Sequence, residues 1–578
     1  MKHLLRQRIS EALSVVTGLE KDDIEASLDV PKNSEHGDLA FPCFLLAKQR
    51  RQAPPAIASA LAKEIVLPDG IESAIALGPF INFRFERSAY IGQVLQEVCD
   101  RRQTTSLLSD VKDKKVLVEY SSPNIAKPFH VGHLRATLIG NCLDRVYRFA
   151  GYQVESINHL GDWGTQFGFV WAGSHLWGKP EKPLVSDLVS LYRRATALKE
   201  EQDKGAVSAE NADLPDVNLL ARDYFLALER GEDEAVNFWK WCVAISLDYL
   251  KGTYKRLDID FDHYTGESFY SDKLDDIRDK LSGTGALRNS DGALGIDLSE
   301  DLGFARISAP DGRSLYLARD IAAAEYRWET FSFSRCLYVV GAPQSLHFKQ
   351  LKAVLSLLGR TYVDRLEHVE FGHVLGMKTR GSGGFIELND LLDEAQERAL
   401  SAYRDQVTKR PEGLDENLVA KTVGLSAIVF STLSKTRHKD VQFSWDHALE
   451  FQGDTGPYLL YAYARINGVR QKAAEIGIKE ASPDQAGSLL KEESAFHLSM
   501  RIDDFEEMLS KTISQNEPAI LANYSLELAK DFSRAYTDLK VIGAEAEEAQ
   551  ARLALFESTR VTLGQCLELL GITPLERM

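Results

Sequence analysis

Residues 119–135 read EYSSPNIAKPFHVGHLR, and the residues at 130–133, His-Val-Gly-His, lie where a strand-like run gives way to a helix-like one. An apolar run at 116–118 comes before them. After them, apolar residues recur at the helical spacings of four, three and four, at Ile139, Leu143, Val146 and Ala150. A helix N-terminus favours phosphate, because its backbone N–H groups and its dipole both attract negative charge. Glycine admits a close approach of a nucleotide, and two imidazoles can donate hydrogen bonds to phosphate oxygens. The stretch therefore predicts a phosphate-binding turn between a strand and a helix.

The bulk composition describes an ordinary globular chain. At 578 residues it has room for about three to four domains, since a domain usually takes about 100–200 residues. Its 44% hydrophobic and 26% charged residues are typical of globular proteins in water. No apolar run approaches the roughly 18 residues of a membrane span, and the first residues lack a signal-peptide pattern. We therefore expect no membrane partner.

Cysteine spacing and net charge narrow the class further. The six cysteines lie far apart without a CxxC pair, so we expect no structural zinc, no disulfide framework and a reducing, cytoplasmic location. The net charge of −17 disfavours nonspecific nucleic-acid binding. One local basic surface could still bind RNA while the acidic remainder repels wrong contacts.

The order of patterns along the chain predicts a doubly wound parallel sheet. Strand-like runs at 116–120, 153–158 and 336–341 alternate with helical patterns at 134–150 and 320–330. Before them, a helix near 41–65 and a strand at 80–85 indicate a small α+β unit, followed by a polar linker at 100–115. We expect an N-terminal domain at 1–110, a nucleotide-binding domain at 111–375 with a helical insertion at about 175–265, a connecting segment at 376–440 and a helical domain at 441–578.

Five motifs in a fixed order point to one family. They are the HVGH stretch, NHLGDWGTQFG at 158–168, LYLARD at 315–320, YVVGAPQSLH at 338–347, and WD at 445–446 with GDTGPYLLY at 453–461. HVGH resembles the HIGH signature of class I aminoacyl-tRNA synthetases, and together the five resemble the arginyl-tRNA synthetases. The resemblance implies an α/β fold: a class I Rossmann-like core, an N-terminal α+β domain for the tRNA elbow and a C-terminal all-helical anticodon-binding bundle.

The implied reaction joins L-arginine to ATP, with Mg²⁺ on the phosphates, and transfers the arginyl group to tRNA(Arg). No protein nucleophile is needed, so catalysis rests on positioning and electrostatic stabilisation. The resemblance assigns catalysis to Lys127, His130, Gly132 and His133. Further ATP contacts would be Gly161, Asp162, His347, Lys378 and Arg380. The stretch 376–384, GMKTRGSGG, departs from the second class I signature, KMSKS, and the family is thought to use the lysine upstream of HVGH instead.

An arginine pocket needs carboxylates, because a guanidinium is planar, permanently charged and carries forked donors. The resemblance places there Glu119, Ser121, Asn124, His130, Tyr316, Asp320 and Gln344. Buried acceptors arranged for a fork would reject lysine and neutral analogues. Outside the motif context, Glu119 and Asp320 could equally be ordinary ends of a strand and a helix.

Contacts to tRNA are expected at both ends of the chain, which we expect to act as a monomer. Tyr458 and Tyr461 share a helix face, and unstacked RNA bases commonly stack on such aromatics. Tyr536 and Met578 match family positions near the anticodon, whereas Lys540 stands where some relatives have an aromatic residue. For the tRNA elbow, the candidates lie in one turn-like loop, at Asn33, His36 and Asp38. Spacing alone favours a core role for the two tyrosines, and only the resemblance makes a contact with RNA an equal alternative.

Three alternatives remain open on the sequence. A class I synthetase for another amino acid would be separated by amino-acid competition. A tRNA-binding protein that has lost catalysis would keep the fold, and the altered KMSKS segment is compatible with it. A small-molecule adenylyltransferase would have no use for a C-terminal helical domain of about 130 residues, so deleting that domain would leave its activity intact.

Overall fold

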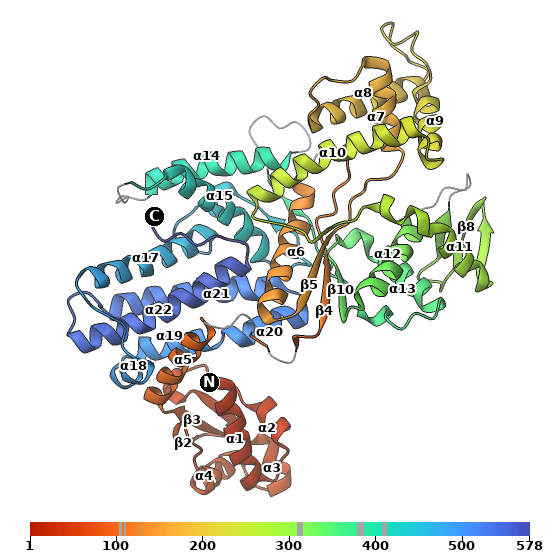
Figure 1. Cartoon of the computed structure of the whole chain (residues 1–578). Coiled ribbons are helices and arrows are strands. Elements are labelled where there is room, and N and C mark those ends of the chain that lie inside the picture. Colours follow the sequence, from red (N-terminus) through yellow and green to blue (C-terminus); the bar gives the residue numbers. More distant parts are fainter. Residues whose placement is uncertain (103–106, 109–110, 128, 309–315, 378–385, 407–412) are drawn as a thin grey trace.

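The computed structural model describes residues 1–102, 107–108, 111–127, 129–308, 316–377, 386–406 and 413–578. The chain forms a small N-terminal domain, a central sheet with its helices, an all-helical insertion and a large helical bundle (Figure 1). Among the helices of this described part, none is both long and apolar enough to cross a membrane.

An all-parallel sheet with the strand order β11-β10-β4-β5-β6 forms the centre and confirms the predicted doubly wound class. Its strands are β4 (Lys115–Glu119), β5 (Gln153–Asn158), β6 (His263–Tyr264), β10 (Arg335–Tyr338) and β11 (Leu366–His368). The helices next to them in the sequence are α6 (Val131–Ala150), α12 (Tyr316–Phe331) and α13 (Ser345–Leu357). From β4 the chain continues to one side through β5 and returns on the other side through β10. The carboxyl end of β4 is therefore the switch point at which such sheets bind ligands.

The N-terminal domain is a three-stranded antiparallel sheet, in the order β1-β3-β2, with helices around it. Its elements are α1 (Lys2–Thr17), α2 (Lys21–Ser27), β1 (Leu39–Pro42), α3 (Phe44–Arg50), α4 (Pro54–Glu64), β2 (Ile71–Leu77) and β3 (Phe80–Phe85). The single helix expected near 41–65 is divided in two. Arg51 ends α3 in a left-handed conformation, and Pro54 starts α4, where its missing N–H is not needed.

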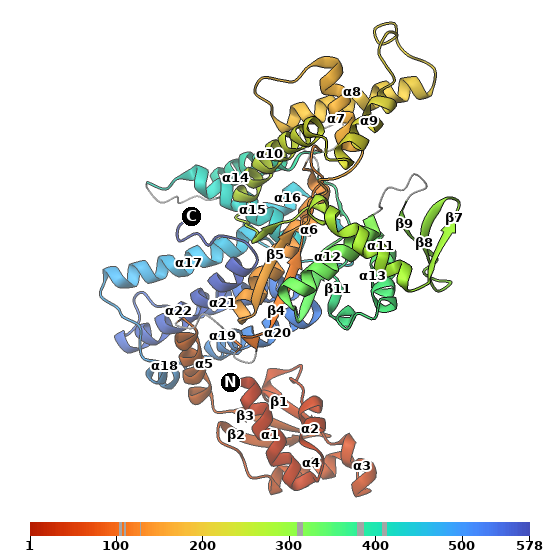
Figure 2. The ribbon, with the colours of Figure 1, turned by 45° about the vertical axis from the view of Figure 1, so that its right-hand side comes forward.

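Helix α5 (Arg87–Arg101) joins this domain to the rest of the molecule. It leaves the small domain and packs against the helices α18 (Pro483–Leu489) and α19 (Glu493–Asp503) of the C-terminal bundle (Figure 2). Residues far apart in the sequence are thereby brought together at the base of the bundle.

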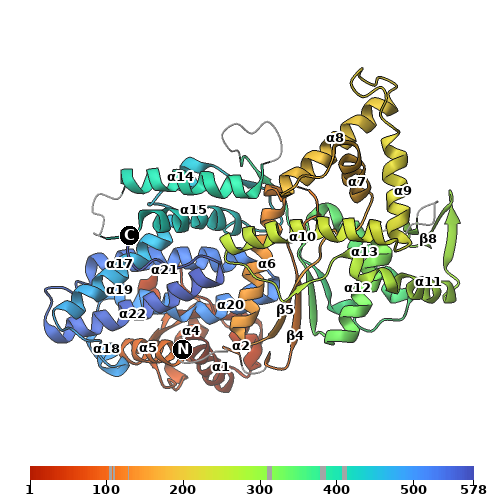
Figure 3. The ribbon, with the colours of Figure 1, turned by 45° about the horizontal axis from the view of Figure 1, so that its top comes forward.

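The insertion lies between β5 and β6 and is entirely helical. It consists of α7 (Gln166–Trp177), α8 (Val185–Asp203), α9 (Val217–Glu229) and α10 (Asp233–Arg256). The long helix α10 leads from the insertion back to the sheet and passes beside α6 (Figure 3). A second addition follows β6: α11 (Leu274–Gly283) and the antiparallel strands β7 (Leu287–Ser290), β8 (Ala293–Asp297) and β9 (Phe304–Ser308). These strands are four or five residues long with little apolar alternation, and the sequence did not predict them.

The C-terminal part confirms the predicted all-helical bundle. A short parallel pair, β12 (Val374–Leu375) with β13 (Val441–Gln442), spans the stretch before it. The remaining helices are α14 (Leu388–Gln406), α15 (Glu416–Leu433), α16 (Trp445–Ala448), α17 (Gly456–Glu475), α20 (Phe505–Gln515), α21 (Pro518–Asp538) and α22 (Ala546–Leu569). Gly456 lets α17 approach α15, because a Cβ there would lie 2.1 Å from the Ser426 carbonyl oxygen.

Candidate active site

The HVGH motif forms the N-terminal end of α6. His130 is the N-cap residue, and its Nδ1 accepts the backbone N–H of Gly132 at 3.0 Å. The Nδ1 of His133 accepts the backbone N–H of His130 at 3.4 Å, which completes a reciprocal capping arrangement. A Cβ on Gly132 would lie 2.6 Å from the His130 ring, so the motif needs glycine there. The motif thus builds the kind of helix terminus that binds phosphate.

The two imidazoles are held as neutral donors. Because Nδ1 accepts a hydrogen bond in each ring, the proton of each neutral ring lies on Nε2. Burial lowers the pKa of His130. Burial lowers the pKa of His133 to about 4, and the charges of His130 and Lys127 act in the same direction. At neutral pH the pair, with ring centroids 4.2 Å apart, therefore supplies N–H donors without carrying positive charge.

The NHLGDWG loop is clasped to the segment before HVGH. Asn124 and Gly161 form a parallel bridge, in which Ile125 N–H donates to the Gly161 carbonyl and Gly161 N–H donates to the Pro123 carbonyl, both at 3.1 Å. A Cβ on Gly161 would lie 2.4 Å from Oδ1 of Asn124, so the close approach requires glycine. Two of the five motifs therefore meet at the carboxyl ends of β4 and β5.

Lys127 lies between this clasp and the helix. Its side chain is half-buried, and its ammonium charge contributes to the lowered pKa of His133, which places the two groups near each other. The two other expected cationic phosphate contacts, Lys378 and Arg380, lie outside the described residues.

The described residues that follow the GMKTRGSGG stretch are anchored to HVGH. The backbone N–H of Val131 donates to the Ile386 carbonyl at 3.2 Å, and the N–H of Leu388 donates to the Phe129 carbonyl at 2.8 Å. On the other side of the stretch, Gly376 has a φ of 82° and packs against the backbone of Phe443. Ile386 and Leu388 thus lie directly beside the first turn of α6.

Asp320 lies on the first turns of α12 between two histidines. Its Oδ2 is 2.6 Å from Nε2 of His347, and its Oδ1 is 4.0 Å from Nε2 of His159. The side chain of Asp320 keeps 26% of its surface exposed, so the carboxylate is partly open to solvent. His347, which was expected to border ATP, thus lies beside Asp320, the carboxylate expected to bind arginine.

A second buried carboxylate, Glu267, belongs to the same region and was not singled out by the motifs. Burial raises the pKa of Glu267 to about 8; the Arg319 guanidinium opposes this effect, and the charges of Asp320 and Asp162 reinforce it. Nε of Arg319 is 3.9 Å from Oε2 of Glu267, and its Nη1 donates to the Glu267 carbonyl at 3.1 Å. The sequence feature that could have pointed to Glu267 is the Gly-Glu-Ser run at 266–268. It lies one residue after the short strand β6, at the carboxyl edge of the sheet.

Glu119, at the end of β4, is engaged by an arginine of this chain. Its Oε2 is 2.5 Å from Nη1 of Arg327, and both side chains are more than nine-tenths buried. Arg327 lies two turns beyond Asp320 on α12, so the pair ties the helix that carries Asp320 to the central strand. The Glu119 carboxylate therefore has a guanidinium beside it, whereas the carboxylate of Asp320 faces two imidazoles.

The other expected arginine contacts divide by exposure. Ser121 is buried, and its hydroxyl oxygen is 2.7 Å from that of Tyr254. Asn124, Tyr316 and Gln344 are exposed on the surface of the described part. The pKa of Tyr316 is raised by burial of its hydroxyl and by the charge of Glu267, which places that hydroxyl near the second carboxylate.

Asp162, expected to contact ATP, is turned toward the loop that carries Glu267. Its Oδ1 accepts the backbone N–H of Ser268 at 2.8 Å, and its Oδ2 accepts the Ser268 hydroxyl at 2.6 Å. Its backbone carbonyl accepts the indole N–H of Trp239, on α10, at 2.7 Å. Asp162 thus joins three segments: its own loop, the segment of Ser268 and helix α10.

In the C-terminal bundle, two of the expected RNA contacts are brought together by an arginine. The guanidinium of Arg465 lies 4.9 Å from the ring centroids of both Tyr461 and Tyr536. Tyr458 instead turns its hydroxyl into the bundle, 3.0 Å from that of Ser533. Met578 is buried, so its side chain packs within the bundle.

The loop expected to face the tRNA elbow is a tight turn. Asn33 Oδ1 accepts the backbone N–H of Glu35 at 3.1 Å, and both Asn33 and His36 are exposed. Asp38 is buried, and its Oδ2 accepts the backbone N–H of Phe85 at 2.8 Å. Asp38 thus fastens the loop to β3, while the other two side chains face solvent.

Comparison with known proteins gives the same family for every part of the chain. A model of the class I (R) tRNA synthetase catalytic domain matches residues 94–445. Models of the DALR anticodon binding domain and of the arginyl tRNA synthetase N terminal domain match residues 459–578 and 3–85.

Individual relatives span the full length. Arginine--tRNA ligase of Alkaliphilus metalliredigens is 39% identical over 581 residues, 99% of each chain. That of Clostridioides difficile is 39% identical over 97% of each. The solved arginyl-tRNA synthetase of Thermus thermophilus superposes with a TM-score of 0.78 at 25% identity, covering 99% of this chain and 100% of the other. That of Plasmodium falciparum, at 24% identity and a TM-score of 0.79, shares the fold over 99% of each chain. From the motifs to the full-length matches, this chain belongs to the arginyl-tRNA synthetases, the class I family of arginine--tRNA ligases.

Proposed function

We propose that this chain activates L-arginine with ATP and passes the arginyl group to the 3′-terminal adenosine of tRNA(Arg). A carboxylate oxygen of arginine would bond to the α-phosphorus while the bond to pyrophosphate breaks, and a ribose hydroxyl would then displace AMP. The observation that carries the proposal is the meeting of two chemistries at one sheet edge. A helix terminus with the neutral donors His130 and His133 follows β4, and the carboxylates Asp320 and Glu267 lie on neighbouring segments.

The ATP side is proposed to work by positioning and electrostatics. The Nε2–H groups of His130 and His133 would stabilise phosphate charge as it develops, and the positive end of the α6 dipole would act in the same direction. Lys127 would add a positive charge beside them, and the backbone at Gly161 would admit the adenosine. Within the described residues, no group of three or more His, Cys, Asp or Glu side chains could hold a metal ion. Mg²⁺ is proposed to arrive together with ATP, where it would neutralise part of the phosphate charge.

The arginine side is proposed to use Asp320 and Glu267 as the forked acceptors. A guanidinium could satisfy both carboxylates, whereas the single ammonium of lysine could not span them in the same geometry. Tyr316, Gln344 and Asn124 would contact the rest of the substrate from the rim. Glu119 and Ser121 would support the pocket from beneath, because both are already engaged inside the protein.

The tRNA would be held at both ends of the chain. We propose that bases of the anticodon loop stack on the Tyr461–Arg465–Tyr536 group, since aromatic and guanidinium planes accept any base. Asn33 and His36 would contact the elbow. The protein is proposed to act as a cytoplasmic monomer without structural zinc.

The deciding experiment is the charging of total tRNA with each labelled amino acid, in the presence of ATP and Mg²⁺. We expect charging with arginine alone. Charging with another amino acid would overturn the assignment of Asp320 and Glu267 to a guanidinium. Binding of tRNA without any charging would favour the reading as a tRNA-binding protein instead.

A further inference from the structure

A chain of buried hydroxyl groups runs beneath the segment that joins β4 to α6. Asn158 Nδ2 donates to the Tyr254 hydroxyl at 2.9 Å, and that hydroxyl is 2.7 Å from Oγ of Ser121. Ser121 Oγ is 2.8 Å from Oγ1 of Thr137, which in turn is 2.7 Å from the carbonyl of His133. All four side chains that form these hydrogen bonds are buried: Asn158, Tyr254, Ser121 and Thr137. The chain therefore links the end of β5 to the first turn of the HVGH helix.

The protons of this chain can be ordered in one direction. The His133 carbonyl can only accept, so Thr137 donates its single proton there. Ser121 must then donate to Thr137, and Tyr254 to Ser121, while Asn158 supplies the bond that Tyr254 accepts. Burial raises the pKa of Tyr254, so the phenol keeps the proton that it donates. Each hydroxyl accepts once and donates once, and such chains strengthen their own members.

The segment above the chain has an unfavourable backbone conformation. Ser121, Ser122 and Ala126 have φ angles of 70°, 46° and 57°, in the left-handed region that residues with a Cβ rarely adopt. The N–H of Ala126 donates to Oγ of Ser246, on α10, at 3.3 Å. Strained conformations persist only where the surroundings hold them, and this segment presents Lys127 to the proposed phosphate site. Helix α10 therefore holds the segment at two points, through Ser246 and Tyr254.

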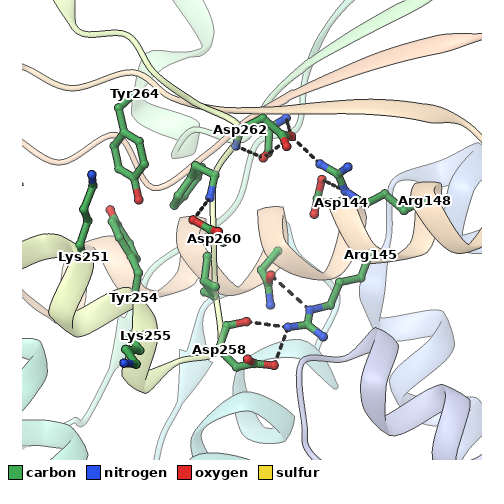
Figure 4. A pocket seen from close by; sticks show the side chains of 14 residues that line it. Asp144, Arg145, Arg148, Lys251, Tyr254, Lys255, Asp258, Asp260, Asp262 and Tyr264 are labelled. Atoms are coloured by element: carbon green, nitrogen blue, oxygen red, sulfur yellow. Dashed lines mark hydrogen bonds and ion pairs between the residues drawn. The ribbon is translucent and has the colours of Figure 1, made fainter.

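Tyr254 comes from the last turn of the insertion. Its ring lies between those of Phe129 and Phe261, with centroids at 5.4 and 5.1 Å. Behind it a cavity of about 830 Å³ opens beside α6, and Figure 4 shows Tyr254 on α10 at its edge, next to Lys251 and Lys255. The two aromatic neighbours pack against the ring, and its hydroxyl meets Ser121 and Asn158.

We propose that Tyr254 is a positioning residue for adenylate formation, which through Ser121 and Thr137 holds the β4–α6 segment and the first turn of α6 in the geometry that ATP requires. The inference rests on the proposed function, because it assigns the segment to the activation step. The hydroxyl touches no reacting atom. The proposed guanidinium contacts, Asp320 and Glu267, lie on other elements and remain in place without it.

The test compares two Tyr→Phe variants, each of which removes one buried hydroxyl. In Tyr254→Phe we expect kcat for arginylation of tRNA to fall about tenfold, since small displacements of reacting groups are costly. The KM for arginine should change less than threefold, because the carboxylates that would bind the guanidinium are untouched. The control is Tyr224→Phe on α9, whose hydroxyl is also buried and donates to the Ala235 carbonyl at 2.8 Å. It should lower the melting temperature by a similar amount and leave kcat unchanged.

A second variant tests whether the groups act as one chain. Thr137→Val removes the last hydroxyl with little change of shape. If the groups act as one chain, the double variant with Tyr254→Phe should be no less active than the less active of the two single variants. Multiplicative losses would overturn the chain. Equal kinetic constants for Tyr254→Phe and Tyr224→Phe would overturn the role of Tyr254. If wild-type protein does not charge tRNA with arginine at all, the proposed function fails first, so the two failures are distinguishable.

Discussion

Glu267→Gln should remove most of the pH dependence of the KM for arginine. The wild-type carboxyl has its pKa raised to about 8 by burial and by its acidic neighbours. In the empty pocket it is therefore mostly protonated at neutral pH. A bound guanidinium favours the ionised form, so arginine binding must release a proton below that pKa.

The size of the effect follows from the same pKa. If the bound complex requires ionised Glu267, the apparent KM exceeds its limiting value about elevenfold at pH 7 and about 1.3-fold at pH 8.5, from the fraction protonated in a group with a pKa of about 8. The wild-type KM should thus fall about eightfold over this interval. Glu267→Gln carries no titrating proton there, so its KM should be higher than that of wild type at pH 8.5 and nearly flat.

The assay is steady-state arginylation at saturating ATP and tRNA, at half-unit steps from pH 7 to pH 8.5. Proton release on arginine binding, measured by calorimetry in buffers of different ionisation enthalpy, gives an independent reading. A wild-type KM that is constant over the interval would refute the reasoning, as would a steep dependence that persists in Glu267→Gln.

The same residue makes a prediction for stability. The folded-state pKa of Glu267 is raised, so its contribution to stability is present at acidic pH and is lost as the pH rises through about 8. Glu267→Gln lacks this loss, and its melting temperature relative to wild type should therefore rise between pH 6 and pH 9. Thermal unfolding without arginine measures the difference. A relative melting temperature that falls with pH would contradict the assignment.

Three further variants test the remaining proposed contacts. Lys127→Ala should slow adenylate formation in a pre-steady-state assay with little change in arginine binding, and equal rates would refute its phosphate role. Asp320→Asn should raise the arginine KM about a hundredfold, because it removes the negative charge proposed to pair with the substrate guanidinium; an unchanged KM would exclude Asp320 from the pocket. Arg465→Met should raise the KM for tRNA about tenfold through lost stacking, with the KM for arginine unaffected. An unchanged KM for tRNA would exclude Arg465 from the proposed contact with the anticodon loop.

Some side-chain roles follow from short-range sequence. The HVGH motif caps its own helix, since His130, Gly132 and His133 contact one another within four residues. Apolar spacing indicated β5 at its observed bounds, and it indicated α6 within three residues of its start. These contacts are local, so neighbouring residues suffice to predict them.

Other roles depend on residues that meet only in the folded chain. Arg327 lies on α12 and pairs with Glu119 at the end of β4, and no spacing in the sequence announces that pair. Glu267, the second candidate carboxylate, follows a strand of only two residues. A strand this short cannot be recognised from its sequence pattern. Likewise, Tyr461 and Tyr536 become one surface only because Arg465 lies between them.

Residues close to one another in the sequence predicted the family and the class of fold, and they predicted a phosphate-binding turn at HVGH, because motifs, periodicity and helix caps are local features. The environment of each carboxylate came from long-range packing, which pairs the buried Glu119 with Arg327 and leaves Asp320 partly exposed. It likewise brought Tyr254, from the last turn of the inserted helices, within 2.7 Å of Ser121 in the segment before HVGH. The charge and hydrogen bonding of a buried group depend on all the elements packed around it, and that packing exists only once the chain has folded.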